Sequence, residues 1–173
     1  MDLAPFIRNV PDFPSPGIQF KDITTLLLHP DAHRYVIDTY YDRYENAALD
    51  ALVAMDARGF LFGSTLAYRL GLPLVLVRKA GKLPADTIAA DYTLEYGTAT
   101  LELHRDALTH GDRVVVVDDL LATGGTMRAA AKLIEQLGAK IQEFAFVIEL
   151  PPLRGREKLK DYQVHSLVEF MVE

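Results

Sequence analysis

Four consecutive valines, residues 114–117, constrain the fold more than any other part of this 173-residue sequence. A short run of β-branched residues is typical of a strand that is buried on both faces. The run leads into Asp118 and Asp119, then into a loop of small residues, and then into an apolar pattern with helical spacing. We therefore predict a strand, a turn and a helix, which together form the basic unit of a parallel α/β sheet.

Other segments repeat this alternation of short apolar strands and helices. The predicted strands are residues 51–55, 73–77, 141–150 and 164–168. One predicted helix begins near residue 29, and two others cover residues 60–70 and 127–137. Residues 92–104 alternate in polarity, which is typical of an antiparallel ribbon. The pattern predicts a single α/β domain over residues 1–173, with a central, mainly parallel sheet flanked by helices.

The amino-terminal arm, residues 1–28, has a different character. Pro11, Pro14, Pro16 and Gly17 interrupt it, so we expect an extended, turn-rich segment instead of a helix. Phe20 gives this arm an aromatic side chain, whose commonest use is packing in a core.

Composition excludes several classes of protein. The sequence has no cysteine, which rules out disulfides, cysteine-ligated metals and a cysteine nucleophile. The net charge of −6 disfavours non-specific binding to nucleic acid. No basic segment followed by a long apolar run is visible at the start, and the apolar runs are too short to span a bilayer. We expect a soluble, cytoplasmic protein that binds neither membranes nor nucleic acid.

The loop after the four valines has the composition of a phosphate-binding site. Gly124 and Gly125 allow successive backbone N–H groups to face one concavity, and Thr123 and Thr126 add hydroxyl groups. The start of the following helix adds partial positive charge. A tight turn with a threonine cap is the simpler alternative. Neither a Walker loop nor a dinucleotide fingerprint is present.

The acidic pair before this loop needs a separate explanation, because carboxylates repel phosphate. Asp118 and Asp119 are suited to ribose hydroxyls, or to a magnesium ion with its water shell. Ligands of parallel α/β sheets bind at the carboxyl ends of the strands. That rule directs attention to the loops after Met55, after Val77 and after Val117.

The sequence VVVVDDLLATGGT resembles the phosphoribosyl-pyrophosphate (PRPP) motif of type I phosphoribosyltransferases. The segments PDFPSPGIQFKDIT, ARGFLFG, VRKAGKLP, LEYGTATLELH and GREKL resemble the adenine phosphoribosyltransferase family, in the expected order. This resemblance implies the type I phosphoribosyltransferase fold, with a small amino-terminal hood and a flexible catalytic β-ribbon loop at residues 79–104. It also implies transfer of a pentosyl group from PRPP to adenine, giving AMP and pyrophosphate, with Mg²⁺ and as a homodimer.

The resemblance assigns roles to residues of the PRPP site. The 5′-phosphate would bind a segment that we call the phosphate cradle, Ala122, Thr123, Gly124, Gly125 and Thr126. Ribose and Mg–PRPP would bind Asp118 and Asp119. Pyrophosphate would bind Asp56, Ala57, Arg58, Arg78, Lys79 and Lys82, and such families often hold a cis non-proline peptide in the first of these loops. No direct metal ligand is implied, because PRPP and water would carry most of the Mg²⁺ coordination.

The resemblance also assigns the base site and the chemistry. Glu95, in LEYG, matches the family's catalytic carboxylate, and Tyr96 belongs to the same loop, residues 85–96. Adenine would bind Gln19, Phe20, Lys21 and Leu120. Taken alone, Glu95 could be a solvent-facing residue of a ribbon, and three cations in five positions are usually a solvated loop.

This sequence departs from the pattern of the family that it resembles at Thr24-Thr25, at Thr98 and at Lys21. None of these departures affects the cradle or Glu95, but they bear on the choice of base. Two alternatives stay open from the sequence. One is a phosphoribosyltransferase for another base such as xanthine, and the other is a PRPP- or nucleotide-sensing regulator that has lost the chemistry.

Overall fold

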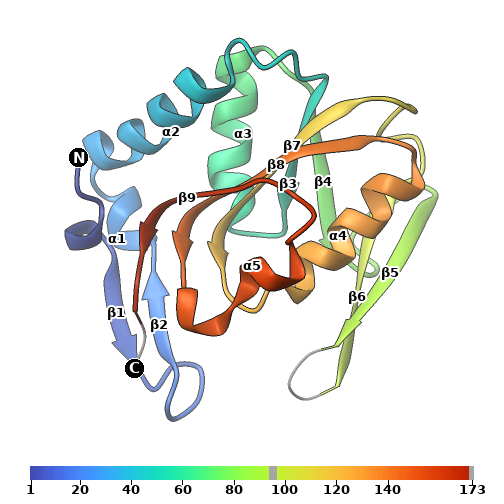
Figure 1. Cartoon of the computed structure of the whole chain (residues 1–173). Coiled ribbons are helices and arrows are strands. Elements are labelled where there is room, and N and C mark those ends of the chain that lie inside the picture. Colours follow the sequence, from blue (N-terminus) through green and yellow to red (C-terminus); the bar gives the residue numbers. More distant parts are fainter. Residues whose placement is uncertain (94–96, 172–173) are drawn as a thin grey trace.

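The computed structural model describes residues 1–93 and 97–171. Their main feature is a seven-stranded sheet with the strand order β5-β6-β4-β3-β7-β8-β9 (Figure 1). Its strands are β3 (Ala51–Met55), β4 (Leu74–Lys79), β5 (Thr87–Thr93), β6 (Thr98–His104), β7 (Arg113–Leu121), β8 (Lys140–Glu149) and β9 (Val164–Glu169). Strands β4, β3, β7, β8 and β9 are neighbours in this order and pair in parallel. At the β4 edge, β6 and then β5 add antiparallel pairs. The prediction of a mainly parallel α/β sheet is confirmed.

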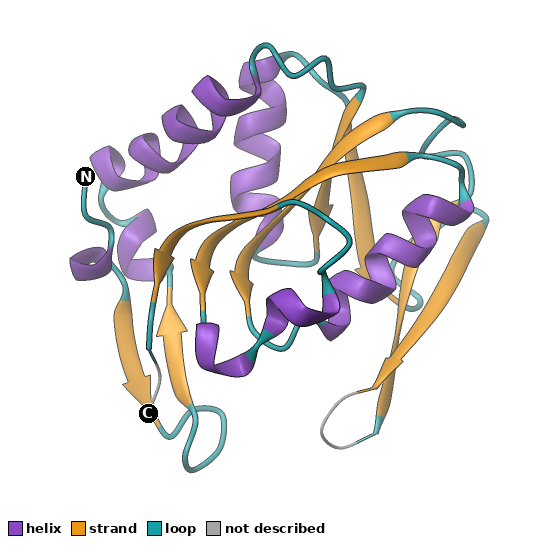
Figure 2. Cartoon of the chain, in the orientation of Figure 1, coloured by secondary structure: helices purple, strands orange, loops and turns teal. Residues whose placement is uncertain are grey.

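Helices cover both faces of this sheet (Figure 2). They are α1 (Thr24–Leu27), α2 (Pro30–Tyr44), α3 (Gly59–Leu70), α4 (Gly125–Gln136) and α5 (Gly155–Lys158), with 3₁₀ turns at Ala4–Phe6 and Pro151–Leu153. Val114 and Val116 pack in the core with α4, whereas Val115 and Val117 pack in the core with α2 and α3. The four valines are therefore apolar without alternation because each face of the strand meets a helical layer.

Three elements are longer than the sequence predicted. β7 continues to Leu121 instead of ending at Val117, because its parallel pairing with β8 extends to Glu149, and the acidic pair lies within the strand. β4 includes Arg78 and Lys79, which pair with β6. The ribbon begins at Thr87 instead of residue 92, so much of the predicted flexible loop is paired strand. For β7 and β4 the pairing partner lies far along the sequence, so local patterns do not reveal it, whereas β5 pairs with β6, the next strand of the same ribbon.

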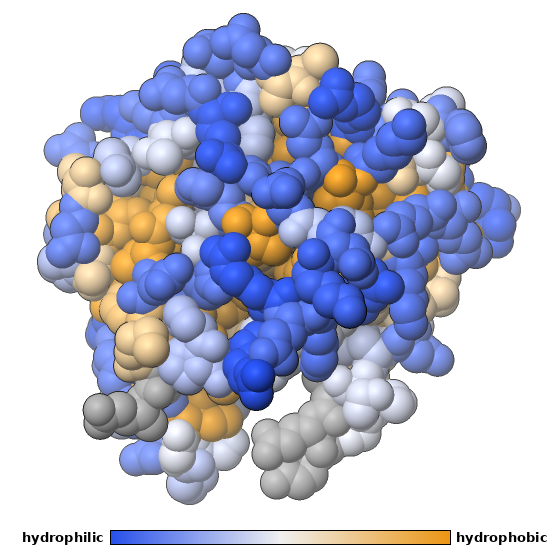
Figure 3. Space-filling model, viewed as in Figure 1, coloured by the Kyte–Doolittle hydropathy of each residue, from blue (hydrophilic) through white to orange (hydrophobic). Residues whose placement is uncertain are grey.

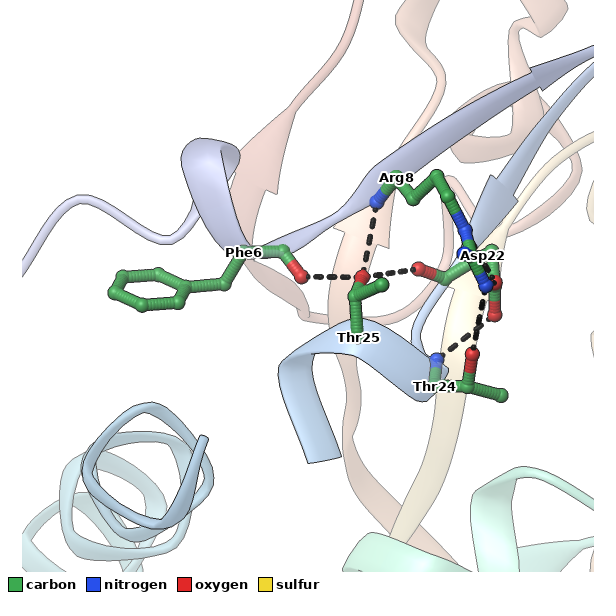
Figure 4. Close-up of polar contacts among 5 residues, drawn as sticks. All are labelled: Phe6, Arg8, Asp22, Thr24 and Thr25. Atoms are coloured by element: carbon green, nitrogen blue, oxygen red, sulfur yellow. Dashed lines mark hydrogen bonds and ion pairs between the residues drawn. The ribbon is translucent and has the colours of Figure 1, made fainter. Parts of the chain in front are cut away.

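The amino-terminal arm forms a separate two-stranded antiparallel sheet from β1 (Arg8–Pro11) and β2 (Gln19–Asp22). Figure 4 shows how polar contacts attach it to α1. The Arg8 guanidinium pairs with Asp22 at 2.5 Å, and the Thr25 hydroxyl donates to the Phe6 carbonyl at 2.7 Å. Hydrogen bonds from Arg8 and Thr24 lower the pKa of Asp22 to about 2. The carboxylate is therefore charged at neutral pH, where it pairs β2 with β1 through Arg8 and accepts the Thr24 N–H at the start of α1.

The surface seen over α4 and α5 is mainly hydrophilic (Figure 3). No helix among the described residues combines the length and the apolar character that crossing a membrane requires.

Candidate active site

The order of the strands creates a crevice at the carboxyl ends of β3 and β7. From β3 the chain continues to β4 on one side, whereas β7 leads to β8 and β9 on the other. Loops that leave in opposite directions open a space between them, where ligands of such sheets bind. A cleft of about 310 Å³ occupies this position. Its lining combines the three predicted loops: Asp56, Arg58, Lys79, Tyr92, Asp118, Asp119, Leu120, Leu121, Ala122, Thr123, Gly124, Thr126 and Met127.

The phosphate cradle forms the turn between β7 and α4. Gly124 has φ +77°, a conformation that favours glycine, and α4 begins at Gly125. A Cβ atom on Gly124 would lie 2.6 Å from the carbonyl oxygen of Gly155, so the backbone at this turn is closely packed. The first N–H groups of α4 have no partners within the helix and carry partial positive charge toward the turn. The structure thus places the predicted cradle at a helix N-terminus suited to an anion.

The acidic pair lies at the end of β7, beside the cradle. Asp119 is buried, and its backbone N–H donates to Asp118 Oδ1 at 2.8 Å. Burial, together with the charge of Asp119, raises the pKa of Asp118 well above its usual value. Gly59 permits the loop after β3 to approach, since a Cβ there would lie 2.9 Å from Asp118 Oδ1. The two loops therefore face one another across the cleft.

Arg58 connects the acidic pair to the arm. Its Nε donates to Asp119 Oδ2, and its guanidinium carbon lies 5.5 Å from the centre of the Phe20 ring. Partial burial works to lower the pKa of Arg58, but the charges of Asp119 and Asp118 raise it overall. The side chain therefore stays cationic. The Asp56–Ala57 peptide in the same loop is cis, as the family resemblance implied.

The other predicted cations lie around the same loop. Arg78 Nε is 3.3 Å from Asp56 Oδ2, and Arg78 Nη1 donates to the Lys82 carbonyl at 3.3 Å. Lys79 lines the cleft, whereas the Lys82 side chain is exposed outside it and only the Lys82 carbonyl contacts Arg78. The structure thus brings Arg58, Arg78 and Lys79 together with Asp56, and leaves the Lys82 side chain outside.

The predicted base site lies on the arm. Phe20 packs edge-to-face on Phe13 with 5.1 Å between ring centres, beside a pocket of about 260 Å³. The side chains of Gln19 and Lys21 both bind Asn9, at 2.7 and 2.9 Å. The polar ends of both side chains are therefore engaged within the arm.

Two predicted residues, Glu95 and Tyr96, lie outside the described residues. The structure adds three cleft residues that the sequence analysis did not assign to the site, Tyr92, Leu121 and Met127. Tyr92 is signalled by the alternating polarity of the ribbon, where every second residue faces the same way. Met127 gave no signal apart from its position in the first turn of α4.

Comparisons with known proteins agree with this site. The family model of the phosphoribosyl transferase domain matches residues 22–172. The adenine phosphoribosyltransferase of Chloroflexus aurantiacus is 58% identical over 169 residues, covering 98% of each chain. The crystal structure of the enzyme from Thermoanaerobacter pseudethanolicus has a TM-score of 0.94 at 52% identity, covering 97% of this chain and 98% of its own.

A more distant structure extends the comparison. Adenine phosphoribosyltransferase from Saccharomyces cerevisiae, crystallised with an imino-altritol bisphosphate and adenine, has a TM-score of 0.91 at 40% identity and covers 96% of both chains. The fold and the cleft define a phosphoribosyl transferase domain. Within that class, the chain belongs to the adenine phosphoribosyltransferase family.

Proposed function

We propose that this protein transfers the 5-phosphoribosyl group from PRPP to adenine, giving AMP and pyrophosphate. One observation carries the proposal: a phosphate cradle, an acidic pair and a cationic loop surround a single cleft, and Arg58 joins that cleft to an aromatic arm. These four features correspond to the 5′-phosphate, the ribose, the pyrophosphate and the base of the reactants. The relatives named adenine phosphoribosyltransferase support the same assignment.

The cradle and the acidic pair would hold the phosphoribosyl group. Backbone N–H groups of residues 122–126 and the hydroxyls of Thr123 and Thr126 are donors for the 5′-phosphate. Each hydrogen bond to a charged group contributes about 1.5–3 kcal/mol, so a few of them hold a dianion firmly. Asp118 and Asp119 would accept hydrogen bonds from the ribose hydroxyls, which orients C1′ for attack.

Arg58, Arg78 and Lys79 would bind the pyrophosphate. A guanidinium presents a planar fork of donors that matches phosphate oxygens. Arg58 is paired with Asp119 in this structure. When PRPP binds, Arg58 would therefore turn to the pyrophosphate, and Asp119 would be left to bind the ribose.

Mg²⁺ fits this donor set as a partner of PRPP. It prefers hard oxygen ligands, keeps several waters, and is usually bound by one or two carboxylates plus substrate phosphates. Asp118 and Asp119 supply such oxygens, and the described residues contain no cluster of three or more metal-ligating side chains. When bound, the ion would neutralise charge on the departing pyrophosphate.

Phe20 and Leu120 would pack on the faces of adenine, while backbone groups of Gln19 and Lys21 would contact its edge. At C6, the exocyclic amine of adenine donates a hydrogen bond, whereas hypoxanthine and guanine present a carbonyl oxygen that only accepts one. A backbone carbonyl at that position would be left unpaired by the wrong base, which costs binding energy.

In the chemical step, N9 of adenine forms a bond to C1′ while the C1′–oxygen bond to pyrophosphate breaks. The bonding electrons leave with pyrophosphate, and N9 loses its proton. Glu95, the predicted catalytic carboxylate, would manage this proton and oppose the positive charge that develops on the ribose ring. Closure of its loop, which includes Tyr96, would exclude water that otherwise hydrolyses PRPP.

A single competition assay tests the proposed function. The protein is incubated with Mg²⁺, PRPP and equimolar adenine, hypoxanthine, guanine and xanthine, and the nucleotides are separated. AMP alone is the expected product. IMP, GMP or XMP would overturn the assignment of the base, and binding of PRPP without any nucleotide would favour a regulator.

Two further properties stay predictions from the sequence and the family resemblance. They are a homodimer, which the molar mass in solution tests, and a cytoplasmic location.

A further inference from the structure

The short helix α5 packs against the phosphate cradle and is fixed by an ion pair between the partly exposed Arg156 and the buried Glu149. Four residues do not form a stable helix alone. Arg156 binds both oxygens of Glu149, with Nε–Oε1 at 2.6 Å and Nη2–Oε2 at 2.7 Å. Ser166 donates to the same carboxylate at 2.6 Å, and Glu149 is only 3% exposed. This network sets where α5 lies relative to the ends of β8 and β9.

The backbone of α5 contacts the backbone of the cradle directly. A Cβ on Gly155 would lie 2.3 Å from the Ala122 carbonyl oxygen, and one on Gly124 would lie 2.6 Å from the Gly155 carbonyl oxygen. Both positions therefore require glycine. Because the contact is between backbones, the position of α5 and the shape of the cradle are coupled.

Lys158, the last residue of α5, brings its ammonium group to the cradle. Lys158 Nζ lies 3.8 Å from the position of a Cβ on Gly125, and Thr123 Oγ1 lies 3.9 Å from the same point. The neighbouring charges are already paired, Arg154 with Glu157 and Arg156 with Glu149. Within residues 1–93 and 97–171, no ion pair of Lys158 is found.

This placement brings an exposed ammonium group close to the positive end of a helix. Gly125 is the first residue of α4, so Lys158 lies beside the positive end of a helix, where cations are disfavoured. An anion between the ammonium and the helix N-terminus would turn this repulsion into two attractions. The cations that line the cleft, Arg58 and Lys79, come from the loop after β3 and the end of β4, whereas Lys158 approaches the cradle from α5.

We propose that Lys158 is a phosphate-binding residue of the cradle, and that it contacts the 5′-phosphate of PRPP and AMP. This inference depends on the proposed function in one respect, which is that the bound phosphate belongs to PRPP or AMP. It assigns to the GREKL segment a role in substrate binding, with Arg156 and Glu149 as positioning residues that hold Lys158 in place.

The test compares Lys158→Met with Lys158→Arg, and uses Lys132→Met as a control, because Lys132 is an exposed lysine further along α4. The measurements are KM for PRPP, KM for adenine, kcat, and the Kd of ribose 5-phosphate by calorimetry. Lys158→Met should raise KM for PRPP and the Kd of ribose 5-phosphate about tenfold, which is the loss of one charge-assisted hydrogen bond. KM for adenine should change by less than about twofold.

Further readouts separate charge from structure. Lys158→Arg should restore most of the affinity, and Lys132→Met should behave as the wild type. The affinity of the wild type for ribose 5-phosphate should fall more steeply with salt than that of Lys158→Met. The thermal midpoint of Lys158→Met should stay within about 2 °C of the wild type, as for an exposed substitution.

An unchanged Kd for ribose 5-phosphate in Lys158→Met would overturn the proposal, as would equal losses for adenine and for PRPP. The proposed function fails separately, if the wild type makes no AMP. In that case a tenfold weaker binding of ribose 5-phosphate by Lys158→Met would still support the role of Lys158.

Discussion

The two ends of the cleft are built in different ways. The phosphate cradle is continuous with β7 and α4, and its backbone packs against that of Gly155. The base end lies on a separate two-stranded sheet, which the partly exposed Arg8–Asp22 pair holds together and which contacts α1 through hydrogen bonds such as Thr24 N–Asp22 Oδ1 and Thr25 Oγ1–Phe6 O. A site made from core strands takes its shape from the fold, whereas a site on an attached arm depends on a few polar contacts. We therefore expect substitutions at the cradle to be more damaging than substitutions at the arm.

Glu95 belongs to neither end, and the largest loss of turnover is expected there. Glu95→Gln removes the carboxylate that would take the N9 proton, so kcat should fall about 100- to 10,000-fold. KM for PRPP should change little, because the cradle is intact. Steady-state kinetics measure both values. Asp91→Asn, which alters an exposed carboxylate of the ribbon, is the control. Equal losses in kcat and in PRPP affinity would refute the catalytic role.

Gly124→Ala tests the cradle end. The left-handed backbone at φ +77° costs about 1–2 kcal/mol with alanine, and the new Cβ would clash with Gly155. We expect kcat/KM for PRPP to fall about 100-fold, or roughly 3 kcal/mol. Gly111→Ala is the matched control, since Gly111 has φ +93° but nothing within 4 Å of an added Cβ. If both variants lose the same activity, close packing at the cradle is not what shapes the site.

Phe20→Ala tests the base end. Stacking of a base on an aromatic ring contributes about 1–3 kcal/mol, so KM for adenine should rise roughly tenfold or more. KM for PRPP should stay within about twofold of the wild type, because the arm does not form the cradle. Phe20→Tyr keeps the ring and should keep most of the affinity. A Phe20→Ala enzyme with unchanged KM for adenine would show that the ring only packs in the arm.

Asp22→Asn tests the attachment of the arm and should have the smallest effect. In the wild type, the pKa of the Asp22 carboxyl is about 2, below the usual 3.8, so the charged form of Asp22 stabilises the folded state. That contribution is complete above about pH 5 and is lost as the pH falls from about 4 to 2. Because its partner Arg8 is half-exposed, we expect the charged Asp22 to contribute about 1 kcal/mol or less to the free energy of unfolding.

Urea unfolding at several pH values measures this contribution. The stability difference between the wild type and Asp22→Asn should be constant from about pH 5 to 8 and should shrink below about pH 4. Asp31→Asn removes a carboxylate paired with Arg34 at 3.1 Å on the surface and serves as the control. A stability difference that grows on acidification would mean that the charged form of Asp22 does not stabilise the fold.

The place of the cradle between a strand and a helix could be predicted because the information is local. Four valines, an acidic pair and a glycine loop follow one another, and chain order alone places them at the end of a strand. The family resemblance supplied the rest of the predicted site, including Arg58. Two things could not be predicted. The extension of β7 to Leu121 depends on pairing with β8, and the position of Lys158 depends on the Arg156–Glu149 pair. Both arise from tertiary contacts that leave no local pattern.

The division of the cleft into a phosphate end and a base end is tested most directly by the affinity of Phe20→Ala for two ligands, measured by calorimetry. Ribose 5-phosphate contains only the groups that the cradle and the acidic pair would bind, whereas AMP also contains the base. We predict that Phe20→Ala binds AMP about tenfold more weakly than the wild type and binds ribose 5-phosphate equally well. Equal losses for both ligands would contradict this division.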